Sequence, residues 1–369
     1  MSFPAFDRWA IRFKPLSDRK NKVLIPRDLV MPDAPGRQLP AAAAATLREA
    51  ADRIRAARSE GRPVICAFGA HAIKNGLGPV LIALMSEGWL THLATNGAGI
   101  IHDWEIAFQG RTSEDVRENV AHGEFGIWQE TGQYINLGLL VGAYEGLGYG
   151  QSIGALIAQE GLAIPDRTEL RHTAEKLLSS DPDRAAAAAD LLGVLAAADI
   201  PAGFLSVPHP FRRWSAQAAA RELGVPFTGH PSIGHDIIYA HPWNNGGAVG
   251  RTGGRDFLTF AASVSRLEGG VYLSVGSAVM SPMIFEKSLS MSQNLALQRG
   301  VRISNHYILV VDIAESTWDW LKDGEPPADS PAYYLRYCKT FARMGGTMRY
   351  LRADNRDFFL GLLHDLGGR

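Results

Sequence analysis

The chain has 369 residues, of which 46% are hydrophobic and 20% are charged, which fits a globular protein of one large or two modest domains and excludes intrinsic disorder. The formal net charge of −1 excludes a strongly basic nucleic-acid surface, and two cysteines, Cys66 and Cys338, exclude a disulfide framework. No apolar signal core opens the chain and no run resembles a membrane helix. We therefore expect a cytoplasmic α/β protein without nucleic-acid or membrane partners.

The first part of the chain predicts an arm followed by a βαβ unit. Residues 1–39 hold several prolines and predict the arm, and the Ala-rich segment 40–59 predicts a helix. Residues 63–69 form a short apolar run that ends in glycine, which is typical of a buried parallel strand. A helix at 77–86 and a strand at 90–95 follow and complete the unit.

The rest of the chain predicts a helical insertion and then strands that alternate with helices. The insertion covers about 110–200. The expected strands are 202–207, 225–228, 271–275, 307–313 and 347–351, and the expected helices are 213–223, 255–267, 285–298 and 357–366. We therefore predict that residues 40–369 form one catalytic domain, an α/β fold with a doubly wound, mostly parallel Rossmann-like sheet, whose ligands bind at the carboxyl ends of the strands.

Three glycine-containing turns follow predicted strands, at 69–71, 96–99 and 276–278. Glycine lets backbone N–H groups approach a phosphate, and the positive end of a following helix favours the same anion. The fingerprint G-x-G-x-x-G is absent, because the third glycine of the second turn would stand where the sequence has His102. The three turns together still predict a nucleotide cradle.

The segment 227–241 gathers three histidines, His230, His235 and His241, around Asp236. Their spacing fits no standard zinc pattern, so we expect no metal. One alternative is a Gly/Pro-rich loop in which the histidines serve as caps. The other, which we favour, is a polar loop that lines a pocket, with Asp236 held at the rim by the apolar residue Ile237.

Two further places carry residues suited to acid–base or nucleophilic chemistry. His102 and Asp103 follow the second glycine turn and are either an acid–base pair or, for Asp103, a helix cap; the sequence leaves both interpretations open. Lys339 lies near several tyrosines, which would favour a neutral, nucleophilic amine by desolvation. The pattern alone favours a solvated surface lysine.

A series of short segments keeps the order and the turn residues of motifs that occur together in one enzyme family. The segments are 75–77, 95–103, 225–227 with 235–238, 270–276, 331–339 and 352–354. Pro331 lies eight residues before Lys339, which is the spacing between the proline and the catalytic lysine of that family. On these segments the chain resembles the deoxyhypusine synthase family.

The resemblance implies a Rossmann-like homotetramer that uses NAD and forms an imine on Lys339 with the group that it transfers. The cofactor contacts that it implies are Asn96, Gly97, Gly99, His102, Gly276, Ser277, Ala353 and Asp354. The catalytic residues would be Lys339, Asp236 and His235, and the substrate contacts would be Tyr337, Tyr333 and Ser281.

The chain departs from the family where the substrate would bind. Ser281 stands where the family has a histidine, Tyr337 where it has a tryptophan, and Tyr333 where it has an acidic residue. Because a polyamine cation needs carboxylates around it, we expect neither spermidine nor an initiation-factor lysine as substrates. The prediction is a diverged, deoxyhypusine-synthase-like NAD-dependent transferase or oxidoreductase that transiently oxidises a small amine.

Two other functions remain open at the level of the sequence. One is NAD-dependent oxidation or isomerisation of a polyol-like substrate, with His102, His235 or Asp236 as the base and Lys339 polarising an oxygen. The other is a non-catalytic nucleotide-binding module. Carboxylates around the pocket would favour an amine, whereas cations and amides would favour an oxygenated or anionic substrate.

Overall fold

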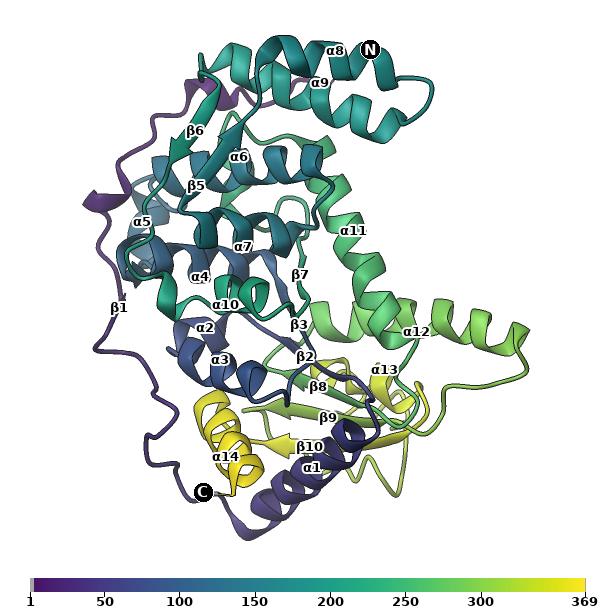
Figure 1. Ribbon diagram of the computed structural model, residues 1–369. Coiled ribbons are helices and arrows are strands. Elements are labelled where there is room, and N and C mark those ends of the chain that lie inside the picture. The colour runs from purple at the N-terminus through teal and green to yellow at the C-terminus, as the bar shows by residue number, and fades with distance from the viewer. Residues whose placement is uncertain (1–2, 369) are drawn as a thin grey trace.

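Six parallel strands form the centre of the computed structural model, which describes residues 3–368 (Figure 1). They are β2 (Val64–Phe68), β3 (His92–Asn96), β7 (Phe227–His230), β8 (Val271–Val275), β9 (Tyr307–Asp312) and β10 (Thr347–Arg352). Their order across the sheet is β7-β3-β2-β8-β9-β10, so the direction of winding reverses between β2 and β8. This is the strand order of doubly wound dinucleotide-binding sheets, and it confirms the predicted fold class.

The central strands are buried on both faces because their sequences are almost wholly apolar. In β2, Val64, Cys66 and Phe68 join one core cluster, whereas Ile65 and Ala67 join the other. This alternation follows from the two-residue period of a strand. A strand that is apolar on both sides requires helices on both faces of the sheet.

Helices cover the two faces accordingly (Figure 1). One face packs against α1 (Ala41–Ser59), α3 (Gly78–Ser86) and α14 (Asn355–Gly367), and the other packs against α11 (Gly246–Val264), α12 (Met280–Gln298) and α13 (Cys338–Ala342). The sequence of α1 shows the reason, since its buried side chains recur at helical spacing. They are Leu47, Ala50, Ala51, Ile54 and Ala57.

Between β3 and β7 the chain forms most of a second, helical layer. Its helices are α4 (Gly97–Gln109), α5 (Val116–Ala121), α6 (Gln129–Glu145), α7 (Tyr149–Gln159), α8 (Arg167–Leu177), α9 (Pro182–Ala197) and α10 (Ala216–Glu222). Helices α8 and α9 pack against each other as a hairpin at the top of Figure 1. Helix α4 begins where β3 ends, so the first element of this layer starts at the carboxyl edge of the sheet.

The strand expected at 202–207 lies outside the central sheet, which corrects the predicted alternation. It is β6 (Gly203–Ser206), and it pairs antiparallel with β5 (Gly161–Ile164), a strand that the sequence did not predict. In β6 only Leu205 is partly covered, whereas the central strands are buried. The segment therefore has the solvent exposure of an edge strand in a two-stranded sheet, not that of a buried parallel strand.

The N-terminal arm runs along the outside of the molecule (purple in Figure 1). Its short strand β1 (Val23–Leu24) pairs antiparallel with β4 (Arg111–Thr112). Arg19 donates two hydrogen bonds of 2.7 Å each to the carboxylate of Glu105 on α4, and both side chains are almost completely buried. This buried ion pair fixes the arm to the helical layer. The division into an arm at 1–39 and one domain at 40–369 stays a prediction.

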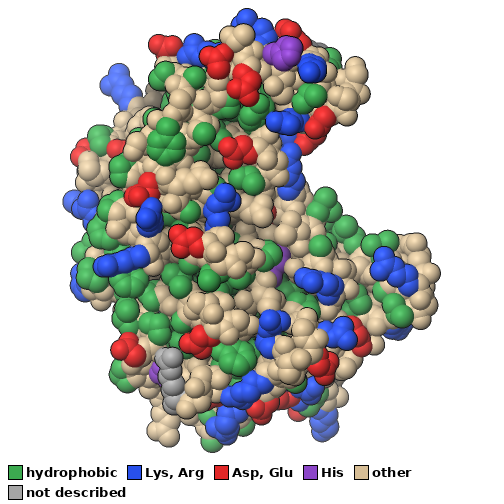
Figure 2. Space-filling view, in the orientation of Figure 1, with side chains coloured by type: hydrophobic (Ala, Val, Ile, Leu, Met, Phe, Trp, Pro, Cys, Tyr) green, Lys and Arg blue, Asp and Glu red, His purple; other side chains and the backbone are tan. Residues whose placement is uncertain are grey.

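Acidic and basic side chains are mixed over the face shown in Figure 2, as the near-zero net charge requires. The same view shows a hollow between the α8–α9 hairpin and the projecting end of α12. Within residues 3–368, no helix combines the length and the hydrophobicity needed to cross a membrane.

Truncating Arg19 should destabilise the fold strongly, because it leaves the Glu105 carboxylate buried without its cation. Breaking a buried ion pair from one side costs about 3–5 kcal/mol, and we expect Arg19→Ala to lower the free energy of unfolding in urea by about that amount. Lys20→Ala is the matched control, because the Lys20 side chain is 89% exposed. Equal losses of stability in the two variants would contradict the role given to the ion pair.

Candidate functional site

The carboxyl ends of β2, β3 and β8 meet at one edge of the sheet, beside a cavity of about 400 Å³ that we call the strand-end cavity. Each strand ends in one of the three predicted turns, so Gly69, Ala98 and Gly276 all line this cavity. The edge includes the boundary between β2 and β8, where the winding of the sheet reverses. In open α/β sheets this reversal point is the usual place for a ligand.

Two of the turns touch through their backbones. A Cβ atom on Gly69 would collide with the carbonyl group of Gly276, so no larger residue fits at position 69 without a shift. Gly276 itself has φ of +58°, in the left-handed region that favours glycine, and the side-chain amide of Asn355 lies next to it. The wall of the strand-end cavity is therefore backbone at this point, and the N–H groups of Gly69 and Gly276 donate to the carbonyls of Val275 and Val311.

The third turn adds a helix N-terminus and a cation. The side chain of Asn96 caps α4 by accepting a hydrogen bond from the N–H of Gly99 at 3.0 Å. The N–H groups of the first helical turn have no acceptor inside the helix, and the helix dipole gives this end a partial positive charge. Lys74 and His71 line the cavity from α2 (His71–Lys74). These groups suit an anion such as a phosphate.

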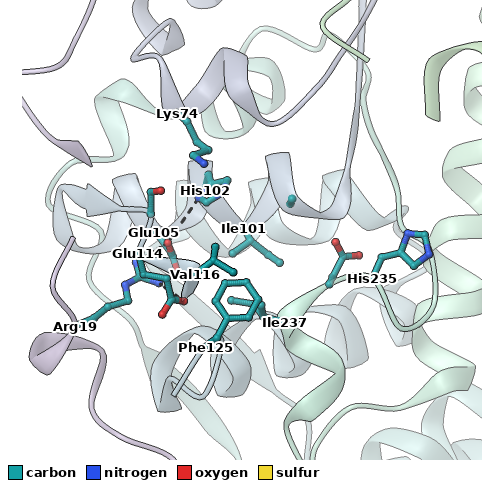
Figure 3. Close-up of a pocket in the computed structure, with 13 residues that line it drawn as sticks. Arg19, Lys74, Ile101, His102, Glu105, Glu114, Val116, Phe125, His235 and Ile237 are labelled. Carbon is teal, nitrogen blue, oxygen red and sulfur yellow. Dashed lines mark hydrogen bonds and ion pairs between the residues drawn. The ribbon is translucent and has the colours of Figure 1, made fainter. Parts of the chain in front are cut away.

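Figure 3 shows the lining of a second cavity of about 180 Å³, which we call the inner cavity. The two share Lys74, Ala98 and His102 in their linings. One part of the inner cavity is apolar, with Ile101, Val116, Phe125 and Ile237. Another part is charged, with Arg19, Glu105, Glu114 and Asp236. A small ligand with both an aliphatic and a charged group matches this division.

Asp236 is the carboxylate of the inner cavity with the least hydrogen bonding. Its Oδ2 atom is buried and has no hydrogen-bond partner among residues 3–368, and it lies so close to Gly97 that a Cβ there would collide with it. Burial raises the pKa of Asp236 to about 6, although the charge of His235 opposes the shift. The hydroxyl groups of Tyr149 and Tyr239 are also buried without a hydrogen-bond partner in the described part of the chain, and both interact electrostatically with Asp236.

The other two carboxylates are fully engaged with protein groups. Glu105 accepts hydrogen bonds from Arg19, Thr112 and Thr131. Glu114 accepts hydrogen bonds from the side chain of Asn119, the indole of Trp128 and the backbone N–H of Gly126. Asp236 is therefore the carboxylate in this cavity with acceptor capacity left for a ligand.

His102 and Asp103 do not form an acid–base pair. The carboxylate of Asp103 accepts hydrogen bonds from the hydroxyl of Ser215 at 2.5 Å and from the N–H of Ala216 at 2.9 Å, so it caps α10. Successive helical residues point in different directions, and His102 instead lines both cavities. Burial lowers the pKa of His102 to about 4, which leaves the ring neutral at pH 7.

The three histidines of 227–241 are spread over different environments. His230 is buried at the end of β7 and bonds to the hydroxyl of Thr228 at 2.9 Å, whereas His241 packs against the rings of Phe13 and Trp243. His235 is exposed on the loop beside Asp236 and lines the inner cavity. In the part of the chain that the structure describes, no group of three His, Cys, Asp or Glu residues is placed to hold a metal ion.

The C-terminal candidates lie apart from the two cavities. The Nζ atom of Lys339 lies over the rings of Tyr333 and Tyr334, at 3.8 and 4.2 Å from their centroids, and neither it nor the partly exposed Tyr337 belongs to either lining. The catalytic role of Lys339 and the substrate role of the tyrosines stay predictions, without support from the cavities.

Three more candidates have structural partners. Ser281 is buried and bonds to the hydroxyl of Tyr272 at 2.8 Å, while its N–H donates to the Ser277 hydroxyl that borders the strand-end cavity. Asp354 caps α14 by accepting from the N–H of Arg356, and the N–H of Ala353 donates to a β9 carbonyl. The residue that follows, Asn355, is the one next to Gly276.

Sequence reasoning missed several residues of the site, namely Arg19, Lys74, Glu105, Glu114 and Asn355. No local pattern marks them, because each is a common residue type whose role depends on what it contacts. Only Lys74 could have been identified as a site residue from the sequence, because it lies five residues after Gly69, the glycine that follows β2.

Comparisons with known proteins give matches only among solved structures; no protein-family model and no curated protein matches the chain. The arginine dihydrolase ArgZ of the cyanobacterial ornithine–ammonia cycle is 14% identical with a TM-score of 0.43, and AgrE in its ternary complex with ornithine and NAD+ is 13% identical with a TM-score of 0.44. Each alignment covers 90% of this chain and 34% of the other, so the chain spans about a third of their length.

The alignment with a conserved putative LOR/SDH protein from Methanococcus maripaludis S2 covers a larger share of the other protein. That protein is 13% identical with a TM-score of 0.43, and the alignment covers 93% of this chain and 73% of that protein.

The predicted membership of the deoxyhypusine synthase family is wrong. No family model matches the chain, and the solved structures named above are an arginine dihydrolase, AgrE and a putative LOR/SDH protein, not a deoxyhypusine synthase. Glycine turns at the ends of parallel strands are common to doubly wound sheets, so matching them segment by segment did not single out one family. The transferase chemistry and its imine were implied by that family and are not carried forward, whereas a catalytic role of Lys339 and the homotetramer stay predictions.

Because the turns after β2 and β8 touch, a methyl group on Gly69 should disturb the strand-end cavity. Overpacking of this kind destabilises a protein by about 1–3 kcal/mol, and we expect Gly69→Ala to lower the free energy of unfolding by that amount. Gly193→Ala is the control, because nothing lies within 4 Å of a Cβ at this helical position. If Gly69→Ala is as stable as Gly193→Ala, the two turns are not in contact.

Proposed function

We propose that the two cavities bind NAD and a small amine, and that the chain is an NAD-dependent enzyme that oxidises this amine. The observation that carries the proposal is the meeting of three glycine turns at the reversal point of the sheet, next to the N-terminus of α4. A dinucleotide is the ligand to which this strand order is best suited. The inner cavity adjoins this place and offers room for a substrate.

The strand-end cavity fits the cofactor in its chemistry. At Gly69 and Gly276 two backbones touch, so main chain rather than side chains bounds the strand-end cavity there. The N–H groups of Gly97 and Ala98 at the start of α4, with the ammonium of Lys74, would hold its negative charge. NAD bound there would supply a hydride acceptor for the substrate.

The inner cavity suits a substrate with an aliphatic part and an amine. Its apolar wall would contact the carbon chain, and Asp236 would attract the nitrogen, because its Oδ2 atom has no other partner among the described residues. On oxidation the substrate nitrogen also loses a proton, which Asp236 would take. With a pKa of about 6, this carboxyl is largely ionised at pH 7 and still basic enough to act as the base.

AgrE, to which this chain is similar, was solved with NAD+ and an amino acid, ornithine. The proposed ligands of this chain are of the same two kinds. The proposal of these ligands rests on the residues that line the two cavities of this chain.

Binding of NAD+ to the purified protein is the direct test of the first half of the proposal. Gly97→Val should weaken that binding at least tenfold in isothermal titration calorimetry, because the side chain would fill the approach to α4 and displace Asp236. Gly193→Ala should bind NAD+ as the unaltered protein does. No binding to the unaltered protein, or the same affinity in Gly97→Val, would refute the cofactor site.

Asp236→Asn should separate the chemistry from cofactor binding. The amide cannot accept a proton at neutral pH, so we expect turnover of small amines, followed by NADH formation, to fall by a factor of about 10² to 10⁴. The affinity for NAD+ should not fall, because the substitution removes a negative charge beside Gly97, where the phosphates of the cofactor would lie. In the unaltered protein kcat/KM should rise as the pH increases through about 6, since the ionised form of Asp236 is the active one.

Two outcomes would count against the amine assignment. One is unchanged turnover in Asp236→Asn, and the other is turnover of polyols but not of amines by the unaltered protein. The second outcome would favour the polyol-like substrate left open by the sequence.

A further inference from the structure

His102 ends a short chain of hydrogen bonds that begins at the buried ion pair. Its Nδ1 atom lies 2.7 Å from the hydroxyl oxygen of Thr112, and this hydroxyl lies 2.5 Å from Oε2 of Glu105 (Figure 3 shows His102 and Glu105). Both cavities are lined by His102. The protonation of this ring therefore determines what a ligand meets at the junction of the cavities.

The charge on Glu105 determines which atom donates in each of these hydrogen bonds. Burial alone would raise the pKa of Glu105, but the charge and hydrogen bonds of Arg19 outweigh it and lower the pKa. An ionised carboxylate only accepts hydrogen bonds, so the hydroxyl of Thr112 donates its single proton to Glu105. The Thr112 oxygen can then only accept from His102, and Nδ1 of His102 must carry a proton.

The neutral ring leaves the second nitrogen of His102 without a proton. The charged and titratable groups that interact with this ring are Lys74 and His71 on α2, Arg19 on the arm and Glu105 on α4. Burial disfavours the imidazolium, and the cations disfavour it further, while only Glu105 opposes them. Lys74 points toward His102 in Figure 3, and its positive charge disfavours a proton on both ring nitrogens at once.

We propose that Glu105 and Thr112 are positioning residues that hold His102 as the Nδ1–H tautomer, so that Nε2 is a fixed hydrogen-bond acceptor at the junction of the two cavities. The site then takes a ligand that presents an N–H or O–H donor there. The donor belongs either to the substrate, as an amine, or to the carboxamide of NAD. The ligand part of this inference rests on the proposed function, whereas the tautomer does not.

Nitrogen-15 NMR of protein labelled at histidine tests the tautomer in the free protein, with the His102 signals assigned by their loss in His102→Gln. We expect a protonated Nδ1 and a bare Nε2 at pH 7. Thr112→Val removes the acceptor for Nδ1–H and should shift the tautomer ratio about fivefold toward Nε2–H, the effect of one hydrogen bond. Thr112→Ser keeps the hydroxyl and should keep the ratio.

An Nε2–H tautomer in the unaltered protein, or the same ratio in Thr112→Val and Thr112→Ser, would overturn the inference. The signals of the other histidines serve as the control for folding, because a general disturbance would move them too. If Thr112→Val does not fold, the spectrum of the unaltered protein still decides the tautomer.

Addition of NAD+ and then of a small amine to the labelled protein tests the ligand. A change in the Nε2 signal with NAD+ alone would assign the donor to the carboxamide, and a change only after the amine would assign it to the substrate. No change with both bound would refute the donor ligand. Failure of NAD+ to bind would refute the proposed function and leave the tautomer measurement intact.

Discussion

The buried ion pair between Arg19 and Glu105 is the interaction on which the site depends most. Two charges taken out of water are stable only if every hydrogen-bonding position is used, and Glu105 meets this condition through Arg19, Thr112 and Thr131. The pair fixes the N-terminal arm to α4 and forms part of the wall of the inner cavity. Through Thr112 it also sets the proton on His102, so one interaction links the fold, the cavity and its chemistry.

Asp236 is buried like Glu105 but lacks the hydrogen bonds that would compensate for its burial. Its Oδ2 atom is buried without a partner among residues 3–368, and burial raises its pKa, which means that the ionised form destabilises the folded state as the pH rises above the usual value for a carboxyl group. The saturated Glu105 and the unsatisfied Asp236 lie in the same cavity. This contrast is typical of a site in which one carboxylate supports the structure and another is kept for a ligand.

The sequence predicted the doubly wound sheet because its signals are local. A short apolar run such as β2 needs only its own residues to be recognised as a buried strand, and the glycines after β2, β3 and β8 mark tight turns wherever they occur. The assignment to deoxyhypusine synthase failed on the same evidence, since turns of this kind belong to many doubly wound proteins. Segment 202–207 was wrongly assigned to the central sheet because the hydrophobicity of a strand does not determine which strand it pairs with.

By itself the sequence determined the strands of the central sheet, their alternation with helices and the three turns. Only the tertiary structure decided that the turns meet at the reversal between β2 and β8 and that Asp236 lies against Gly97. It also paired Arg19 with Glu105, and it placed Lys339 among the tyrosines, outside both cavities. The physical reason is that propensity and hydrophobic period act over a few neighbouring residues, whereas the site consists of contacts between residues far apart in the chain.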